Sequence, residues 1–218
     1  MMDEAEKIQD TIYKEGLELK KEDYLLARRQ IELIGTNNYV LDIGCNDGSL
    51  MKEYAYKNKV IGLELSKEST LKARKNGFDV KIGNVYEMPF KDKSFDVVHM
   101  SEIIEHVLDT DKALSEVHRV LKESGRLIIT TPNCASFRDR ILVLTGHLQG
   151  YMQHTEHVRF FNKERLVRHL KKNKFKVEKV FGSGFSIPYF PGKAITFFFL
   201  DSIIPATLLQ RLIVVARK

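Results

Sequence analysis

The stretch VLDIGCNDG, residues 40–48, links a short apolar run to a turn that contains two glycines. Gly44 and Gly48 allow the backbone to turn sharply and to approach a ligand closely, and Asn46 is among the few other residues that tolerate a left-handed conformation. A dinucleotide-binding turn would carry GxGxxG, whose backbone amides face an anionic pyrophosphate. Here the carboxylate of Asp42 lies two residues before the first glycine. This arrangement favours a ligand that carries positive charge.

Apolar runs and helical patterns alternate along most of the chain on both sides of this stretch. Such alternation predicts an α/β fold with a mostly parallel sheet and helices on both faces. We expect a single domain over residues 1–218 that begins with a helical segment at 1–37. The expected strands are 39–43, 60–63, 79–82, 95–100, 126–131, 175–181 and 212–216, and the expected helices are 3–34, 49–57, 67–76, 111–122 and 164–172.

Two segments interrupt the alternation, at 133–160 and 182–209, and we interpret both as insertions. The first follows the carboxyl end of a strand, where ligands bind in open α/β sheets, so it is a candidate wall of the acceptor site. The second is rich in phenylalanine and holds three of the five prolines. Residues 186–209 could form a lid, a dimer face, a helix on a membrane or lipid substrate, or a terminal helix packed in the core.

Composition sets broad limits on the kind of protein. A chain of 218 residues with 43% hydrophobic residues can bury a full core, and its net charge of +6 favours an anionic partner only weakly. Cys45 and Cys134 are too few for a disulfide framework and form no CxxC pair. We expect a cytoplasmic protein with no targeting segment, and with no transmembrane helix because Asp201 and Pro205 interrupt its longest apolar stretch.

Polar side chains follow the second and third expected strands as well as the first. Glu64 lies 22 positions after Asp42, where a carboxylate can accept hydrogen bonds from both hydroxyls of a ribose. Asn84 follows the third strand and could bond an adenine edge. Ser101 follows the fourth strand, close to the expected ligand. Side chains at the ends of consecutive parallel strands indicate a nucleoside-type ligand.

The segments 42–48, 62–66 (GLELS), 84–85 and 94–98 (SFDVV) resemble the successive motifs of class I S-adenosylmethionine-dependent methyltransferases, a likeness that extends over about 39–181. The resemblance implies a Rossmann-like fold, S-adenosylmethionine as cofactor and transferase activity. It places the turn beside the methionine moiety, Glu64 at the ribose and Asn84 at the adenine. Asn46 replaces the usual middle glycine, and Asn84 stands where the family more often has Asp. The expected cofactor-binding residues are Asp42, Gly44, Cys45, Asn46, Gly48, Glu64, Leu65, Asn84, Val85 and Ser101.

The segment SEIIEHV, residues 101–107, follows the fourth strand, and in a helix Glu102, Glu105 and His106 would share one face. The first insertion adds the imidazoles of His154 and His157. Two carboxylates and up to three imidazoles could hold a divalent cation. The alternative is a purely structural role, in which these side chains cap or pack under a helix, remain solvated, or hold the insertion on the sheet.

The same segment and His157 resemble two metal-using branches, the ubiquinone-pathway O-methyltransferases and the small-RNA 3'-end 2'-O-methyltransferases. That resemblance would make Glu102, Glu105, His106 and His157 metal ligands. Similar segments also resemble small methyltransferases that need no metal, in which case His157 or His106 could act as general base. The candidate catalytic residues are His157, His106 and Glu102.

The sequence thus favours methyl transfer to oxygen or nitrogen of a small-molecule or lipid-linked acceptor. The alternatives are a nicotinamide-dependent oxidoreductase and a non-catalytic protein that binds the cofactor and regulates a partner. RNA methylation is a variant that the net charge permits, but the sequence shows no aromatic and basic platform for single strands, so it does not favour a nucleic-acid acceptor. The sequence makes no prediction of oligomeric state.

Overall fold

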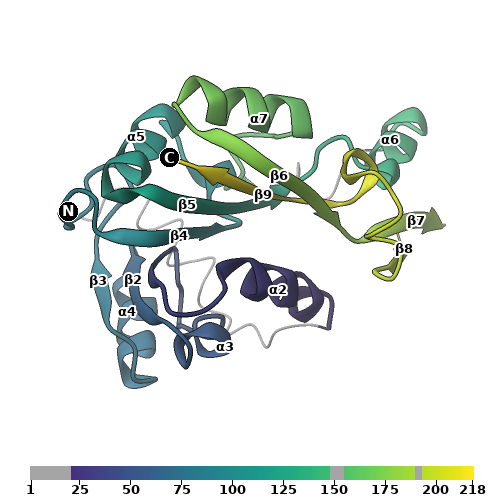
Figure 1. Ribbon diagram of the computed structural model, residues 1–218. Helices are drawn as coiled ribbons and strands as arrows, with labels where there is room; N and C mark the ends of the chain where they lie inside the picture. The colour runs from purple at the N-terminus through teal and green to yellow at the C-terminus, as the bar shows by residue number, and fades with distance from the viewer. Residues whose placement is uncertain (1–20, 148–154, 190–192) are drawn as a thin grey trace.

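A computed structural model describes residues 21–147, 155–189 and 193–218, and Figure 1 shows the arrangement of its elements. The main sheet contains β1 (Tyr39–Ile43), β2 (Lys59–Glu64), β3 (Val80–Ile82), β4 (Phe95–Ser101), β5 (Leu121–Pro132), β6 (Lys176–Ser183) and β9 (Arg211–Arg217). A separate hairpin contains β7 (Phe185–Tyr189) and β8 (Lys193–Phe197). The helices are α2 (Lys21–Ile34), α3 (Lys52–Ala55), α4 (Lys67–Lys75), α5 (Thr110–Val120), α6 (Phe137–Leu144) and α7 (Lys163–Lys172), with 3-10 turns η1 (Ile104–His106) and η3 (Ala206–Leu208).

The seven strands of the main sheet are ordered β3-β2-β1-β4-β5-β9-β6. The five strands from β3 to β5 are parallel, whereas β9 runs antiparallel to both of its neighbours, β5 and β6. The predicted α/β fold with a Rossmann-like, mostly parallel seven-stranded sheet is therefore confirmed. The carboxyl ends of β1, β2, β3 and β4 lie along one edge, so the segments that follow these strands can share a site.

Helices cover both faces of the sheet (Figure 1). Consecutive strand residues point to opposite faces of the sheet. Val97 therefore belongs to the hydrophobic cluster that includes buried residues of α2, α3 and α4, and Val98 to the cluster that includes buried residues of α5 and α7. Both valines are fully buried. A sheet covered on both sides explains why its strands appear in the sequence as continuous apolar runs.

Several boundaries differ from the sequence prediction. The expected helix 49–57 is only four residues long, α3, and α5 ends at Val120 rather than 122 because β5 begins at Leu121, which pairs with Phe95 before a register shift. The N-terminal helix is observed from residue 21, and the expected part at 3–20 lies outside the described residues.

The two insertions fold differently from each other. In 133–160 the chain forms α6, whose N-cap Ser136 accepts a hydrogen bond from the Asp139 backbone, while residues 148–154 lie outside the described part. In 182–209 the chain forms the antiparallel β7–β8 hairpin and η3, so the two alternatives that place an α-helix at 186–209 are wrong for its described residues. The left-handed backbone of Gly184 (φ +78°) separates β6 from β7, which lets the chain leave the main sheet.

None of the helices in the described residues combines the length and the hydropathy needed to cross a membrane.

Candidate functional site

The turn after β1 depends on three residues with positive φ: Gly44 (+72°), Asn46 (+50°) and Gly48 (+79°). A Cβ atom at Gly44 would lie 2.2 Å from Cδ1 of Ile103, which follows β4. The turn is therefore packed directly against the segment after β4, and only glycine fits there. The left-handed conformation expected at Asn46 is observed.

The Asp42 carboxylate is 3% exposed and is bonded inside the core. The Tyr54 hydroxyl donates to Oδ2, and the His99 Nδ1 atom lies 3.1 Å from Oδ1. The other nitrogen of the same ring lies 2.6 Å from Oε1 of Gln30. Burial and the Asp42 charge raise the pKa of Tyr54 well above its usual value. In this structure Asp42 joins β1, β4, α2 and α3, rather than facing an open site as the sequence suggested.

The Glu64 carboxylate lies between the β1 turn and the end of β2. Its two oxygens accept hydrogen bonds from the backbone amides of Asn46 (2.9 Å) and Ser66 (2.8 Å). Glu64 is 1% exposed, and burial raises its pKa, an effect that backbone hydrogen bonds partly offset. The carboxylate thus connects the two loops that the sequence assigned to one ligand.

A pocket of about 160 Å³ lies at the carboxyl ends of these strands. Four of the expected cofactor-binding residues line it, namely Gly44, Leu65, Asn84 and Val85, and so does the candidate catalytic residue His106. The other expected cofactor-binding residues, Asp42, Cys45, Asn46, Gly48, Glu64 and Ser101, are not among its lining residues. The rest of the lining, which the sequence analysis missed, is Ile43, Leu63, Gly83, Tyr86, Ile103, Val107 and Leu108.

Asn84 shapes the wall of this pocket. Its Oδ1 atom accepts hydrogen bonds from the backbone amides of Tyr86 (2.9 Å) and Glu87 (3.1 Å), which closes a tight turn. The Tyr86 hydroxyl in turn accepts from the amides of Leu108 (3.0 Å) and Asp109 (3.3 Å). The loop after β3 is therefore joined to the loop after β4, and an apolar cleft remains between them.

Glu102 adopts a left-handed conformation (φ 53°), and the residues after it form the single turn η1. The expected helical face shared by Glu102, Glu105 and His106 is therefore wrong. Oε1 of Glu102 accepts a hydrogen bond from Thr130 Oγ1 (2.9 Å), and Oε2 lies 3.5 Å from Nε of Arg211. Ser101 Oγ lies 3.1 Å from the same threonine oxygen.

Glu105, His106 and His157 form a cluster in which one potential ligand atom from each residue lies within 4.8 Å of the others. The two imidazole rings meet edge to face, with centroids 4.7 Å apart. Backbone amides of Val158 and Arg159 donate to the Glu105 carbonyl at 3.0 Å each, which holds the insertion against η1. His154 lies outside the described residues.

The Glu105 side chain is 2% exposed, and its two oxygens have different surroundings. Oε2 accepts a hydrogen bond from Thr131 Oγ1 at 3.0 Å. Oε1 is buried, and no described residue forms a hydrogen bond with it. Burial, followed by the Glu102 charge, raises the pKa of Glu105 well above its usual range. A buried carboxylate oxygen beside two imidazoles could take part in proton transfer or hold a cation.

Comparison with known proteins gives a consistent result. A family model described as a methyltransferase domain matches residues 41–129, from β1 to β5. The crystal structure of a SAM-dependent methyltransferase from Thermotoga maritima, described as a possible histamine N-methyltransferase, has a TM-score of 0.68 and 26% sequence identity, and the alignment covers 91% of this chain and 90% of that one.

Two curated relatives align with this chain over different shares of their length. An uncharacterized protein of Methanocaldococcus jannaschii is 29% identical over 92% of this chain and 84% of its own length. A demethylmenaquinone methyltransferase of Symbiobacterium thermophilum is 32% identical over 42% of this chain and 41% of its own length. The matched region is about two fifths of the length of several other curated relatives (43%, 40% and 39%).

Proposed function

We propose that this chain, a member of the class I S-adenosylmethionine-dependent methyltransferases, transfers the methyl group of that cofactor to an oxygen or nitrogen atom of a small-molecule acceptor. In this reaction a lone pair of the acceptor attacks the methyl carbon and the carbon–sulfur bond breaks. The sulfonium becomes the thioether of S-adenosylhomocysteine, and the acceptor loses its proton to a base. The sulfonium is already activated, so positioning supplies much of the rate.

The observation that carries the proposal is the pocket at the carboxyl ends of β1–β3. Residues from three strand ends, Gly44, Leu65 and Asn84, line one cleft with an apolar interior. The polar groups at its edge include the Asn84 amide, and Glu64 lies where the first two loops meet. This combination suits a nucleoside, whose base needs an apolar slot and whose ribose needs a hydrogen-bond acceptor.

His106 supports placing the acceptor beside the same pocket, because it lines the pocket and also belongs to the cluster with Glu105 and His157. Either imidazole could accept the proton that the acceptor loses. Glu102, held by Arg211 and Thr130, remains a candidate for contact with the acceptor. Two of the similar proteins are named for demethylmenaquinone and for histamine, which supports a small acceptor.

A divalent cation could take part in this reaction. The donor set fits one, since Oε1 of Glu105 is buried and forms no hydrogen bond with any described residue. One oxygen of the Glu105 carboxylate and one nitrogen of each imidazole lie within 4.8 Å of one another. Glu105, His106 and His157 would hold the ion, which would lower the pKa of an acceptor hydroxyl and orient it. Titration calorimetry with Mg²⁺ or Zn²⁺ tests this: Glu105→Gln should abolish the heat of binding, whereas the exposed Glu164→Gln should not.

Cofactor binding is tested first, by titration calorimetry with S-adenosylhomocysteine and with NAD. We expect S-adenosylhomocysteine to bind and NAD not to bind. Leu65→Glu places a charge in the pocket and should weaken binding at least tenfold, since it replaces apolar contact with a desolvated carboxylate. Leu71→Glu, at a 65% exposed position on α4, is the matched control and should leave binding unchanged. Preference for NAD, or equal loss in both variants, would contradict the proposal.

Methyl transfer itself is tested with a panel of small phenols, hydroxyquinones and amines, with S-adenosylhomocysteine release as the readout. His157→Ala and His106→Ala should each slow turnover on a hydroxyl acceptor by about 10²-fold or more. His157→Ala should still bind S-adenosylhomocysteine, because His157 does not line the pocket. Unchanged turnover in both variants would exclude these imidazoles as the base.

We also propose that residues 1–218 form a single domain that acts in the cytoplasm. The pairing of β9 with both β5 and β6 supports the first point, because it joins the middle and the end of the chain in one sheet. Cys45 and Cys134 are both free, which agrees with a reducing compartment.

A further inference from the structure

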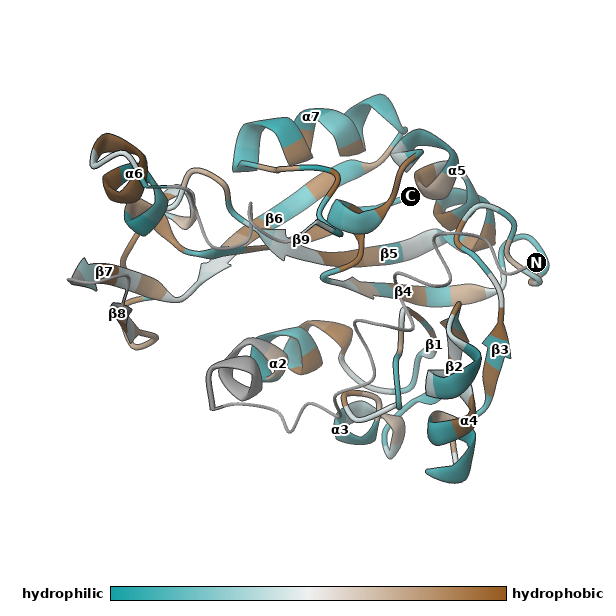
Figure 2. Ribbon diagram, turned by 180° about the vertical axis from the view of Figure 1, so that it is seen from behind, coloured by the Kyte–Doolittle hydropathy of each residue, from teal (hydrophilic) through white to brown (hydrophobic). Residues whose placement is uncertain are grey.

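An apolar projection extends from the sheet beyond the carboxyl end of β5. It consists of residues 137–147, 185–189 and 193–204, and Figures 1 and 2 show α6 and the β7–β8 hairpin together at that end of the molecule. Phe137 and Phe185 pack against each other at its base, with ring centroids 5.3 Å apart. In Figure 2 the end of α6 is brown, whereas α4 and α7 are mostly teal.

Large apolar side chains are concentrated on this projection. Among the described residues eleven large apolar side chains are exposed, and six of them belong to the projection, so the clustering exceeds the scattered exposure of an ordinary surface. Leu144, Phe199 and Ile203 are each at least 74% exposed. The six are Val143, Leu144, Ile187, Ile195, Phe199 and Ile203.

Both carboxylates of the projection accept hydrogen bonds from neighbouring groups of the chain. Its described segments contain two acidic residues, Asp139 and Asp201. Asp139 is buried and bonded to Ser136, while Asp201 accepts hydrogen bonds from Ser183 Oγ and the Gly184 amide, both at 2.9 Å. Arg140 on α6 is exposed. The outer surface of the projection is thus apolar with a positive rim.

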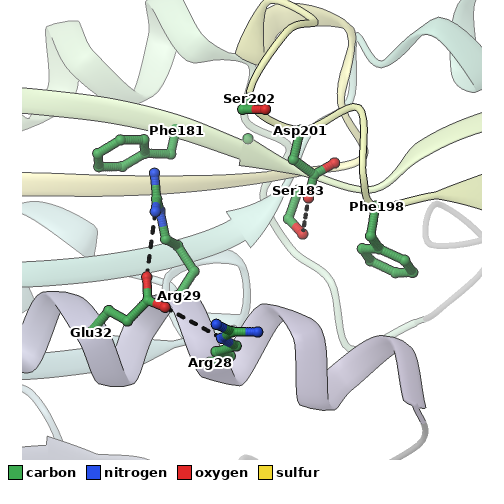
Figure 3. Close-up of a pocket in the computed structure, with 9 residues that line it drawn as sticks. Arg28, Arg29, Glu32, Phe181, Ser183, Phe198, Asp201 and Ser202 are labelled. Atoms are coloured by element: carbon green, nitrogen blue, oxygen red, sulfur yellow. Dashed lines mark hydrogen bonds and ion pairs between the residues drawn. The ribbon is translucent and has the colours of Figure 1, made fainter.

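A second group of cations lies at the base of the projection. Arg28 and Arg29 of α2 line a pocket of about 220 Å³ together with Phe198 and Ser202, and Figure 3 shows the two guanidinium groups facing it. Both arginines share one carboxylate, Glu32, at 3.3 and 3.4 Å. The Arg28 side chain is 70% exposed. Asp201 lines the same pocket and interacts with Arg29, so the exposed Arg28 is the cation of this group that is most available to an anionic surface.

We propose that the apolar projection docks on a lipid bilayer with anionic headgroups, with its six apolar side chains in the acyl boundary and Arg28, Arg29 and Arg140 facing lipid phosphates. Aliphatic and aromatic side chains above a basic rim are the combination that binds such a surface. A second copy of the chain fits less well, because a symmetric contact would bring the same cations together. If the proposed function holds, the acceptor is a lipid-linked or membrane-resident molecule.

Vesicle flotation of the full chain tests the docking, with vesicles of phosphatidylcholine alone and of phosphatidylcholine mixed equally with phosphatidylglycerol. We expect binding to the mixed vesicles, and weaker binding to the neutral ones. Leu144→Glu should reduce binding at least tenfold, because it removes an apolar side chain that would enter the acyl boundary and adds a negative charge. Leu71→Glu, the matched exposed leucine on α4, should have no effect. Arg28→Gln should weaken binding to the anionic vesicles by about fivefold.

Three outcomes would overturn the docking proposal: no flotation with the anionic vesicles, equal loss for Leu144→Glu and Leu71→Glu, or a solution dimer that Leu144→Glu dissociates without any vesicle binding. Flotation is measured without cofactor, and S-adenosylhomocysteine binding is measured without vesicles. A failure of one proposal is therefore distinguishable from a failure of the other.

Discussion

At the level of single residues, the conformation of the turn after β1 was predictable, whereas the role of the Asp42 carboxylate in β1 was not. Positive φ at Gly44, Asn46 and Gly48 follows from the residue types themselves. The partners of Asp42, which are Tyr54 and His99, come from α3 and β4. His99 stands directly opposite Asp42 in the β1–β4 register, a pairing that requires the sheet to be known.

Asp42→Ala should destabilise the fold by about 2–4 kcal/mol, because the Tyr54 hydroxyl and the His99 ring would each lose a buried partner. Urea unfolding measures the change. Asp92→Asn, at a 70% exposed side chain, is the control and should change stability by less than about 0.5 kcal/mol. Full stability with lost S-adenosylhomocysteine binding would instead mean that Asp42 contacts the ligand.

Gly44→Ala should weaken both folding and cofactor binding, because the new Cβ would meet Ile103, which lines the pocket, at 2.2 Å. Gly77→Ala is a matched control, since Gly77 also has positive φ (+91°) but has no atom within 4 Å of such a Cβ. Backbone strain of about 1 kcal/mol is common to both variants. Chemical denaturation should show Gly44→Ala to be the more destabilised by about 1–3 kcal/mol. Calorimetry should show lost affinity in that variant alone.

At the level of elements, helices and strands were predictable where apolar periodicity is strong, as in α7 and β4. Short elements were less so, because α3 and η1 are single turns with little periodicity to detect. Contacts between helices were not predictable at all. Asp111 near the start of α5 bonds Lys172 Nζ (2.6 Å) and Asn173 Nδ2 (2.7 Å) at the end of α7, which joins the two helices on one face.

This contact makes stability depend on pH in acid. Hydrogen bonds from Lys172 and Asn173 lower the pKa of Asp111 from 3.8 to about 2. Because the folded state holds the ionised form, the contribution is present above pH 3.8 and is lost as pH falls toward 2. The pair is exposed, so the effect should be small and weaker in high salt. Urea titrations measure the free energy of unfolding at pH 5 and at pH 2.5. The loss of stability between the two pH values should be smaller in Asp111→Ala than in the wild-type chain. A double-mutant cycle with Lys172→Ala should give a coupling that is smaller at pH 2.5 than at pH 5, because pH 2.5 lies between the ordinary pKa of 3.8 and the lowered one of about 2.

At the level of the whole molecule, the structure has a rigid sheet and an attached hairpin. The strands β1, β4 and β5 lie inside the sheet with neighbours on both sides, whereas β7 and β8 pair only with each other. Ile187 in β7 and Ile195 in β8 are 46% and 54% exposed. Apart from Ser186, the described side chains of the hairpin are half-buried or exposed, and β7 packs on α6 rather than on the main sheet, so the hairpin can open without unfolding the sheet.

Hydrogen exchange should therefore divide the molecule. Amides in β7 and β8 should exchange on the order of 100-fold faster than those in β1, β4 and β5, because local opening exposes the first group and only global unfolding exposes the second. Mass spectrometry of peptic peptides measures both groups in one sample. Equal protection in the hairpin and the sheet would mean that the hairpin is held by more than its own ladder.

The sequence by itself determined the seven strands, their alternation with helices and the turn after β1, because hydrophobic periodicity and residue-specific backbone preferences are local properties. Only the tertiary structure decided that β9 enters between β5 and β6, that Asp42 is bonded to His99, and that Glu105 rather than Glu102 meets the two histidines. Those contacts join residues far apart in the chain. They depend on strand order, on the register of pairing and on the left-handed backbone of Glu102, which the local pattern of side chains does not specify.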